Sequence, residues 1–465
     1  MNRFYDALYP ALPVFAQNVL CTGAGYMRYR SRFSDHFRRT LATWEESIHW
    51  PLERLHGLQR ERLHRLVARA RRHVPYYRDL PPPSDAKDPG QAIRETLDSI
   101  PILEKRAYRD QPRAFLARDV SPHRLYRGRT SGTTGTALPL WYTPETLAEE
   151  HATFWRQRRG CGVNDPADPN ITFNGNIVVP FPQDRAPFWR TNAYNRQTLF
   201  SIFHMTPENL RHYVDAIHAT PARYIQGYPS SIHLVARALL QEQRPVAPGL
   251  LTAIFTSSES LLAFQRETIE KAFNAPVRDR YGVSEFCVSM TECPEGRMHV
   301  DAEFCIVEVE AQEETDEYVT GPLLITGLSH DATPFLRYRI GDAGTLAKKP
   351  CPCGRAGDSF LAIDGRIEDY VKTPDGRLIG RLDHVFKQQL NVAEAQIRQD
   401  SEDAIEVLLI PRPEFTRASE RRLLKEFRSR LGDEIRIETR LVANIPREPN
   451  GKFRAVKSRV GRVSE

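Results

Sequence analysis

The first regular pattern along the chain is helical. Between Phe37 and Asp79, most clearly in LERLHGLQRERLHRLVARARRHV, apolar residues recur at helical spacing and charged residues occupy the opposite face. This pattern predicts a surface helix. Two proline-containing segments follow, PPPSDAKDPG at 81–90 and DQPRAFLARDVSP, and both indicate irregular structure.

From about Tyr126 onward, short apolar or β-branched runs alternate with helical patterns. Examples are ITFNGNIVV, then RYIQGY followed by SSIHLVARALLQEQ, and LLTAIFTS followed by LLAFQRETIEKAF. Such alternation is typical of an α/β fold with a parallel sheet, in which ligands gather at the carboxyl ends of the strands. We therefore expect a binding site along that edge of the sheet.

The pattern changes after Ser289. MHVDAEFCIVEVE, GPLLITGL and PFLRYRIGDAGTLA alternate with period two, which predicts a β-rich subdomain over about 290–362. Near residue 365 the composition changes again, and a βαβ-like pattern follows. We expect a large N-terminal α/β domain with parallel sheets over 1–365 and a small, mobile α+β domain over 366–465.

Composition restricts the class of protein. The 465 residues are 40% hydrophobic and 27% charged, which argues against disorder and against a coiled coil over most of the length. The net charge of +6 is too small to indicate nucleic acid or an anionic membrane as partner, although it could steer an anionic small molecule. No segment approaches the ~18 to 20 apolar residues of a membrane span, and the opening residues lack the apolar core of a signal peptide. We expect a cytoplasmic protein, and a homodimer stays open.

A loop rich in serine, threonine and glycine follows the strand-like LYRGR. Glycines let the backbone approach a phosphate closely, and exposed N–H groups and hydroxyls donate to its oxygens. The loop matches neither G-x-x-x-x-G-K-[ST] nor G-x-G-x-x-G, so in isolation an ordinary surface loop would explain it. Its candidate phosphate-binding residues are Ser131, Gly132, Thr133, Thr134 and Gly135.

Four further motifs follow in order: YGVSE at 281–285, YRIGD at 338–342, DGRIED at 364–369 and PNGK at 449–452. With the loop, and at these distances, they resemble the signature of the adenylate-forming superfamily of acyl-CoA ligases, luciferases and peptide-synthetase adenylation domains. The resemblance covers most of the chain. SGTTG, CPCG and the N-terminal helical region are most similar to the phenylacetate–CoA ligase branch and its capsule polysaccharide biosynthesis relatives. The resemblance implies an ATP-dependent, AMP-forming ligase.

An adenylating enzyme must hold ATP so that a carboxylate attacks the α-phosphorus in line while the charge on the leaving pyrophosphate is compensated. By the resemblance, Ser131 and Thr133 would contact the β- and γ-phosphates together with Thr134, which counts among the catalytic residues. The family loop usually has a lysine a few residues after its second glycine. This chain has none in the run from Thr136 to Pro139, so Arg129 is the candidate for that charge.

The resemblance places Tyr281 against the adenine, Ser284 near the phosphates or the acyl group, and Glu285 on Mg²⁺. A carboxylate suits Mg²⁺, which takes oxygen ligands and bridges phosphate oxygens. Without the neighbouring motifs, Tyr281 would be an ordinary core residue. The nucleotide-binding set also includes Gly282, together with Ser258 and Glu259 from the segment that lines the adenine in the family.

Asp342 would accept hydrogen bonds from both ribose hydroxyls, although an aspartate stabilising its own turn is the alternative. Arg366 resembles an arginine that contacts ribose or phosphate between the domains, and Glu368 and Asp369 occupy the hinge position. Lys452 resembles the catalytic lysine of the superfamily, although an exposed lysine near a chain end is usually just solvated. Its ammonium would neutralise charge in the adenylation transition state and then move away to admit a thiol.

Five of the seven cysteines fall between residues 287 and 353. Cys351 and Cys353 stand in a Pro/Gly turn, and Cys293 and His299 occur upstream in the same β-rich region. Together they would complete a Cys₃His set, which is typical of a structural Zn²⁺ site, and free buried cysteines are the alternative.

Phe173 and Tyr228 suggest an acyl pocket that accepts an aryl group, although packing is the alternative for both. The whole pattern indicates a two-domain ligase that converts a small-molecule carboxylic acid and ATP to acyl-AMP and then transfers the acyl group to coenzyme A. The expected cofactors are ATP, Mg²⁺, coenzyme A and structural Zn²⁺. Alternatives are transfer to a carrier-protein thiol, an amine or a polysaccharide precursor, and a non-catalytic nucleotide-binding scaffold.

Overall fold

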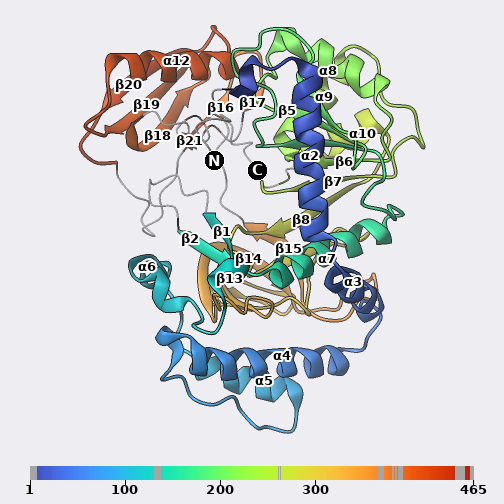
Figure 1. The fold of residues 1–465 in the computed structure, drawn as a ribbon, viewed down its shortest axis with the longest axis vertical. Helices are drawn as coiled ribbons and strands as arrows, with labels where there is room; N and C mark the ends of the chain where they lie inside the picture. Colours follow the sequence, from blue (N-terminus) through green and yellow to red (C-terminus); the bar gives the residue numbers. More distant parts are fainter. Residues whose placement is uncertain are drawn as a thin grey trace.

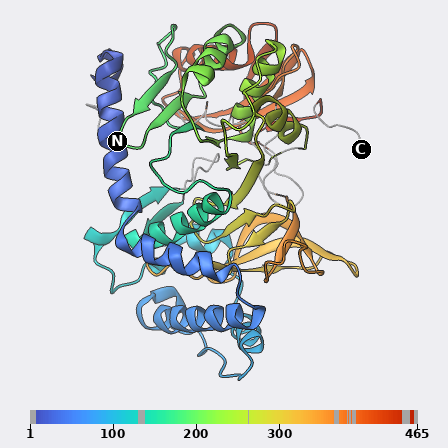
Figure 2. The ribbon, with the colours of Figure 1, turned by 90° about the vertical axis from the view of Figure 1, so that its right-hand side faces the viewer.

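The N-terminal part of the chain is helical in the computed structural model, which describes residues 8–129, 138–259, 261, 263–364, 371–379, 382, 385, 391–445 and 456–460. Figure 2 shows the first long helix standing lengthwise on one side of the molecule and the β-rich part on the other. The helices here are α2 (Val14–Arg32), α3 (Asp35–Ser47), α4 (Leu52–His73), α5 (Pro89–Asp98) and α6 (Lys105–Asp110).

The helix predicted over residues 37–79 is in fact two helices. Helix α3 ends at Ser47, and Pro51 immediately precedes α4, where its missing N–H costs nothing. Helix α4 then ends at His73, two residues before Pro75. Two of its leucines, Leu63 and Leu66, face the core and are at most 1% exposed. Helices α4 and α5 form a layer at one end of the molecule (Figure 1).

Five strands of a 13-stranded sheet carry the parallel pattern expected from the sequence. Strand β3 pairs in parallel with β5 and β6, β6 with β7, and β7 with β8. The α/β fold predicted from the alternating pattern is confirmed. These strands are β3 (Asn170–Asn174), β5 (Gln197–Ser201), β6 (Tyr224–Gly227), β7 (Ala253–Ser257) and β8 (Val277–Gly282), with β4 (Trp189–Asn192) antiparallel at the edge.

Helices cover both faces of the parallel strands, which is why these strands are apolar on both sides. On one face, Tyr224 and Phe255 pack in a core with Trp155 of α7 (Pro144–Gly160). On the other face, Ile225 and Ile254 pack in a second core with three further helices. These are α8 (Pro207–Ala219), α9 (Pro229–Gln241) and α10 (Ala263–Phe273).

The β-rich region continues the same sheet through antiparallel strands, because β8 pairs with β9. A β-hairpin, β1 (Tyr126–Arg129) and β2 (Pro139–Tyr142), stands apart and flanks the phosphate-loop segment. The β-rich strands are β9 (Ser289–Glu292), β10 (Met298–Val300), β11 (Cys305–Val309), β12 (Glu313–Glu314), β13 (Tyr318–Gly327), β14 (Tyr338–Ala347) and β15 (Ser359–Asp364).

The C-terminal region has a four-stranded sheet of its own, in the order β20-β19-β18-β21. Its helix α12 buries Leu423 and Phe427. The turn between β16 and β17 lies beside α9, where Arg237 donates to the Gly376 carbonyl at 3.3 Å, and Figure 1 shows β16 and β17 on the side of this region that faces the α8–α9 helices. Its elements are β16 (Val371–Lys372), β17 (Leu378–Ile379), β18 (Val392–Ser401), β19 (Ala404–Pro411), α12 (Arg417–Leu431), β20 (Arg436–Leu441) and β21 (Val456–Ser458).

None of the helices within the described ranges is both long and apolar enough to cross a membrane.

Candidate active site and metal centre

The carboxyl ends of β6, β7 and β8 bring several predicted residues to one edge of the sheet. The register pairs Gly227 with Thr256 and Ser257 with Arg280, so the segments that follow these strands start side by side. Across this edge, the Ser230 backbone N–H donates to Glu259 Oε2 at 3.2 Å. The edge is the binding position expected for a parallel sheet.

Two motifs that lie far apart in the sequence meet directly at this edge. The Tyr281 hydroxyl donates to Asp342 Oδ2 at 2.6 Å, which joins the YGVSE and YRIGD segments. Burial, and secondarily the Asp342 carboxylate, raises the pKa of Tyr281 well above its ordinary value. The phenol therefore stays a proton donor and holds one carboxylate oxygen in place.

Glu285 lies buried in the turn after β8, at 5% exposure. Its Oε1 lies 3.6 Å from Lys105 Nζ and 3.4 Å from the Tyr338 hydroxyl. Both contacts fall on Oε1, so within the described residues Oε2 remains available to a metal ion. Lys105 of α6 was not predicted as a site residue. The sequence places it in a short link far from any motif, and only pairing of that link with β14, at Leu103 and Tyr338, brings it here.

Ser284 is exposed beside Glu285, and Gly282 ends β8. Ser258 adopts a left-handed backbone conformation (φ 72°), which marks the sharp turn after β7. Arg129 is exposed at the end of β1, next to the phosphate-loop segment. The remaining predicted residues lie outside the described ranges, and their roles stay predictions: Ser131, Gly132, Thr133, Thr134, Gly135, Arg366, Glu368, Asp369 and Lys452.

Of the two residues predicted for an aryl pocket, one lies in the core and the other at a strand end. Phe173 is fully buried, and its ring packs 5.1 Å from that of Phe200 in the core on the α8–α10 side. Tyr228 follows Gly227 at the strand end, and its backbone N–H donates to the Phe173 carbonyl at 2.9 Å. A Cβ on Gly227 would lie 1.9 Å from that carbonyl oxygen, which explains the glycine.

The three cysteines and the histidine predicted as metal ligands converge in the β-rich region. Their ligand atoms all lie within 4.8 Å of one another. Cys293 Sγ and Cys351 Sγ are 3.7 Å apart, and Cys353 Sγ and His299 Nε2 are 3.3 Å apart. Bonds of about 2.3 Å from a tetrahedral ion place two sulfurs roughly 3.8 Å apart, so the donor spacing fits Zn²⁺.

The electrostatics of this cluster also suit a metal. Burial, and then the charge of Arg355, lowers the pKa of His299 to about 4, so the imidazole is neutral and can coordinate. The Cys293–Cys351 sulfur separation is far longer than the ~2.05 Å of a disulfide bond. The donor set and its geometry therefore favour a closed structural site.

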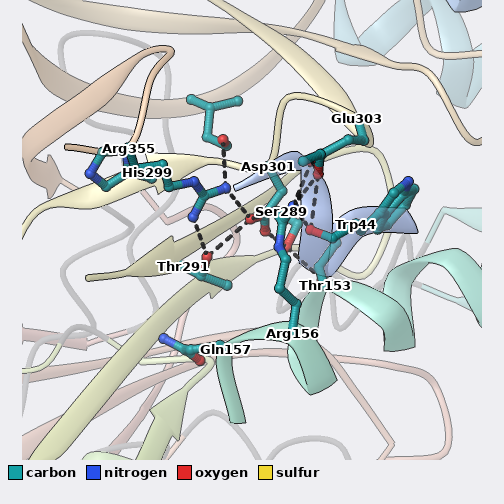
Figure 3. Close-up of polar contacts among 12 residues, drawn as sticks. Trp44, Thr153, Arg156, Gln157, Ser289, Thr291, His299, Asp301, Glu303 and Arg355 are labelled. Carbon is teal, nitrogen blue, oxygen red and sulfur yellow. Dashed lines mark hydrogen bonds and ion pairs between the residues drawn. The ribbon is translucent and has the colours of Figure 1, made fainter. Parts of the chain in front are cut away.

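A buried network of charges lies beside His299 of the cluster (Figure 3). Asp301 Oδ1 accepts from Arg156 at 2.5 Å and from Arg355 at 3.0 Å, while Oδ2 accepts from the Ser289 hydroxyl at 2.6 Å. Arg156 also donates to Glu303 at 2.6 Å. Since Arg355 follows the Cys351–Cys353 turn by two residues and Ser289 begins β9, the network ties the Cys/His cluster to the sheet and to α7.

Known proteins resemble the chain along most of its length. The protein family described as the CapK C-terminal domain matches residues 371–459. Protein CapK of Staphylococcus aureus is 24% identical over 96% of this chain and 98% of its own length. Phenylacetate-coenzyme A ligase of Thermus thermophilus is 23% identical, over 87% and 97% respectively. Indoleacetate–lysine synthetase of Pseudomonas savastanoi is 27% identical, over 77% and 83%.

Among solved structures, a 2-hydroxyisobutyryl-CoA ligase in complex with 2-HIB-AMP and CoA superposes with a TM-score of 0.55. It is 19% identical in sequence, over 88% of this chain and 91% of that chain. At this identity the likeness establishes the fold, which is that of the adenylate-forming ligases.

Fold, motif order and relatives together place the chain in the adenylate-forming superfamily of ATP-dependent, AMP-forming ligases. Within the superfamily, its similarity over most of its length is to the phenylacetate–CoA ligase branch and its CapK-like relatives.

Proposed function

We propose that the protein activates an organic carboxylic acid with ATP, forming an acyl adenylate and pyrophosphate, and then transfers the acyl group to the thiol of coenzyme A. The observation that carries the proposal is the contact between the YGVSE and YRIGD segments after β8, where Tyr281 donates to Asp342 and the Tyr338 hydroxyl lies 3.4 Å from Glu285. These residues come from two separate motifs, and a purely structural role would not require all of them at a ligand-binding edge.

Each of these side chains has chemistry that suits a nucleotide. Asp342 keeps Oδ1 for the ribose diol, because within the described residues Tyr281 occupies only Oδ2. Glu285 would hold Mg²⁺, which neutralises phosphate charge when it is bound. Lys105, 3.6 Å from Glu285, adds a positive charge beside the same position. It is a candidate to supply charge that the lysine-free phosphate loop lacks.

Lys452 is proposed as the lysine that stabilises the adenylation transition state, by its resemblance to the family lysine. It belongs to the C-terminal region, together with the hinge residues Glu368 and Asp369. A lysine carried by a separate unit can be withdrawn after adenylation, and this would open the site to the second substrate.

The acceptor is proposed to be coenzyme A because the similarity of this chain to phenylacetate-coenzyme A ligase extends over 97% of that enzyme's length. An amine is the second candidate, because indoleacetate–lysine synthetase is named for an amino-acid acceptor. The similarity to CapK favours a role in capsule formation, in which a polysaccharide precursor could take the acyl group.

We also propose that Cys293, His299, Cys351 and Cys353 bind a structural Zn²⁺. With four protein ligands, a tetrahedral ion has no open position for a substrate. Bound zinc would therefore hold the β9–β10 hairpin against the Cys351–Cys353 turn and would take no part in the chemistry.

The deciding experiment is ATP–pyrophosphate exchange over a panel of carboxylic acids, followed by analysis of products with coenzyme A, lysine or neither. Acid-dependent exchange is expected, with an acyl-thioester appearing when coenzyme A is present. An Asp342→Ala variant should lose exchange, and Asp215→Asn on the exposed surface of α8 is the matched control. Exchange that is absent with every acid would refute the proposal.

A further inference from the structure

A polar layer between α7 and the sheet lies next to the proposed adenylation site. Glu150, Phe154 and Arg158 follow one another at intervals of four residues, so they share one face of α7. The sheet presents Gln226 and Arg280 to this helix from β6 and β8. Residues that alternate along these strands, such as Ile225, face the opposite core.

Arg158 and Arg280 share one aromatic ring in this layer. Their guanidinium carbons lie 6.0 and 3.5 Å from the centre of the Phe154 ring. Arg158 donates to the neutral Gln226 side chain and lies over Trp155, 5.0 Å from the ring centre. Within the described residues no carboxylate lies within ion-pair distance of Arg158.

A third arginine approaches from the end of α2. Arg32 forms no hydrogen bond or ion pair with any residue that the structure describes. It ends α2, and the ring of the next residue, Phe33, packs 5.9 Å from that of Trp155 on α7. Burial, with the like charges of Arg28 and Arg158, lowers the pKa of Arg32, although Glu150 partly offsets this. Since arginine stays protonated in proteins, its charge is retained at a cost.

The negative charge nearby does not balance these three cations. Glu150 lies 3.3 Å from Arg280, and burial raises its pKa to about 7, so near neutral pH it is only partly ionised. Asp301, the other carboxylate near Arg280, is shared with Arg156 and Arg355. Arg280 Nε is buried without a partner among the described residues. In the part of the chain that the structure describes, the three arginines are partly buried and have only Glu150 as a close carboxylate partner, at Arg280, so the layer is short of negative charge, which is costly.

We propose that Arg32, Arg158 and Arg280 bind a second anionic group, a carboxylate or a phosphate, on the acid that this enzyme adenylates. Arg280 directly precedes Tyr281 and pairs with Ser257 at the end of β7, so its backbone adjoins the nucleotide motifs. Guanidinium groups bind carboxylates and phosphates through paired donors. This inference rests on the proposed function and specifies its substrate class: a dianionic acid, in place of the aryl monoacid suggested by Phe173 and Tyr228.

The test compares acids that differ only in the second anion. Phenylacetate is set against its 2-, 3- and 4-carboxy derivatives, and butyrate against glutarate and 4-phosphonobutyrate, by acid-dependent pyrophosphate release. The variants are Arg158→Gln, Arg280→Gln and Arg32→Gln. The matched control is Arg159→Gln, because Arg159 is the exposed neighbour that pairs with Glu45. Circular dichroism checks folding, and Arg32→Gln, which breaks no hydrogen bond to a described residue, remains informative if another variant fails to fold.

At least one dianionic acid is expected to exceed its monoanionic partner tenfold or more in kcat/KM. Each of the three substitutions should lower that value at least tenfold, while activity on the monoacids stays within about twofold and Arg159→Gln changes neither. Equal turnover of both members of every pair, or a preference that survives all three substitutions, would overturn the inference but leave adenylation intact.

Failure of the proposed function would look different, because no acid would release pyrophosphate. In that case, calorimetric binding of the same acids tests the anion site independently of the reaction. Binding of a dianionic acid that is lost in Arg158→Gln supports the site, and absence of such binding overturns it. The affinity for AMP should be unchanged in all three variants, which separates an acyl-group anion from a nucleotide phosphate.

Discussion

Replacing Asp301 with asparagine tests the buried network beside the Cys/His cluster. Asp301 is fully buried and accepts from two arginines, Ser289 and Thr291. Asparagine keeps nearly the same shape but removes the charge, and its amide group faces donors with a donor of its own. Arg156 and Arg355 would then share only Glu303 as a buried counter-ion.

The size of the effect follows from the burial of these groups. Removing one partner of a buried ion pair costs about 3–5 kcal/mol, because the remaining charge is left without compensation. With an m-value above about 3 kcal/mol/M for a chain of this length, such a loss lowers the urea midpoint by roughly 1 M. Because Asp301 pairs with two arginines, we expect the free-energy cost to lie in the upper half of this range.

The assay is urea unfolding followed by tryptophan fluorescence, since Trp44 and Trp155 lie in the same core as this network. The matched control is Asp215→Asn, which removes a carboxylate from the exposed Asp215–Arg244 pair and should leave the midpoint unchanged. A midpoint for Asp301→Asn within about 0.2 M of the parent would refute the reasoning, since it would mean that the buried charges are not mutually dependent.

Further predictions concern the metal, the nucleotide, the catalytic lysine and pH. Protein purified without chelator should contain one Zn²⁺ per chain by plasma emission spectrometry, and Cys293→Ala should lower both the zinc content and the melting temperature. Parent protein that contains no zinc and melts at the same temperature as the variant would contradict the zinc site. Asp342→Ala should weaken ATP binding at least tenfold in calorimetry, and undiminished affinity would contradict the ribose contact. Lys452→Ala should suppress pyrophosphate exchange at least a hundredfold with ATP affinity nearly unchanged, and normal exchange would exclude its role. Burial pushes the pKa of Glu149 upward, but the hydrogen bond from His36 and the ion pair with Arg62, with a further hydrogen bond from Ser329, outweigh it and lower the folded-state pKa to about 2. Its stabilising effect is therefore present above the unfolded pKa and lost as the pH falls from about 4.3 towards 2, so Glu149→Gln should flatten the acid limb of stability against pH, and an unchanged limb would argue against this ion pair.

The sequence predicted the parallel α/β fold because apolar periodicity is a local property of each segment. Parallel strands covered on both faces carry apolar residues toward each face, as Ile254 and Phe255 of β7 do, and this distinguishes them from the alternating strands after Ser289. The Cys₃His set could also be predicted from the sequence, because few chemical roles bring three cysteines and a histidine into one small region.

The boundaries of the long N-terminal helix were less well predicted. Helical periodicity continues across Pro51, so the amphipathic pattern alone did not show that α3 and α4 are separate helices. The sequence also did not predict which face of a strand packs against which helix. Phe173 lies near the end of β3, a strand that ends at the site, yet its side chain points into the core on the α8–α10 side.

Only the tertiary structure brought Lys105 to Glu285, because this contact depends on the pairing of a short link with β14. It also gathered Arg32, Arg158 and Arg280, which occur on α2, α7 and β8 and belong to no motif. A sequence determines which residues can form a local element or a recognisable ligand set. The electrostatic balance of a buried layer depends on which charges from distant elements share it, and that is decided when the helices pack on the sheet.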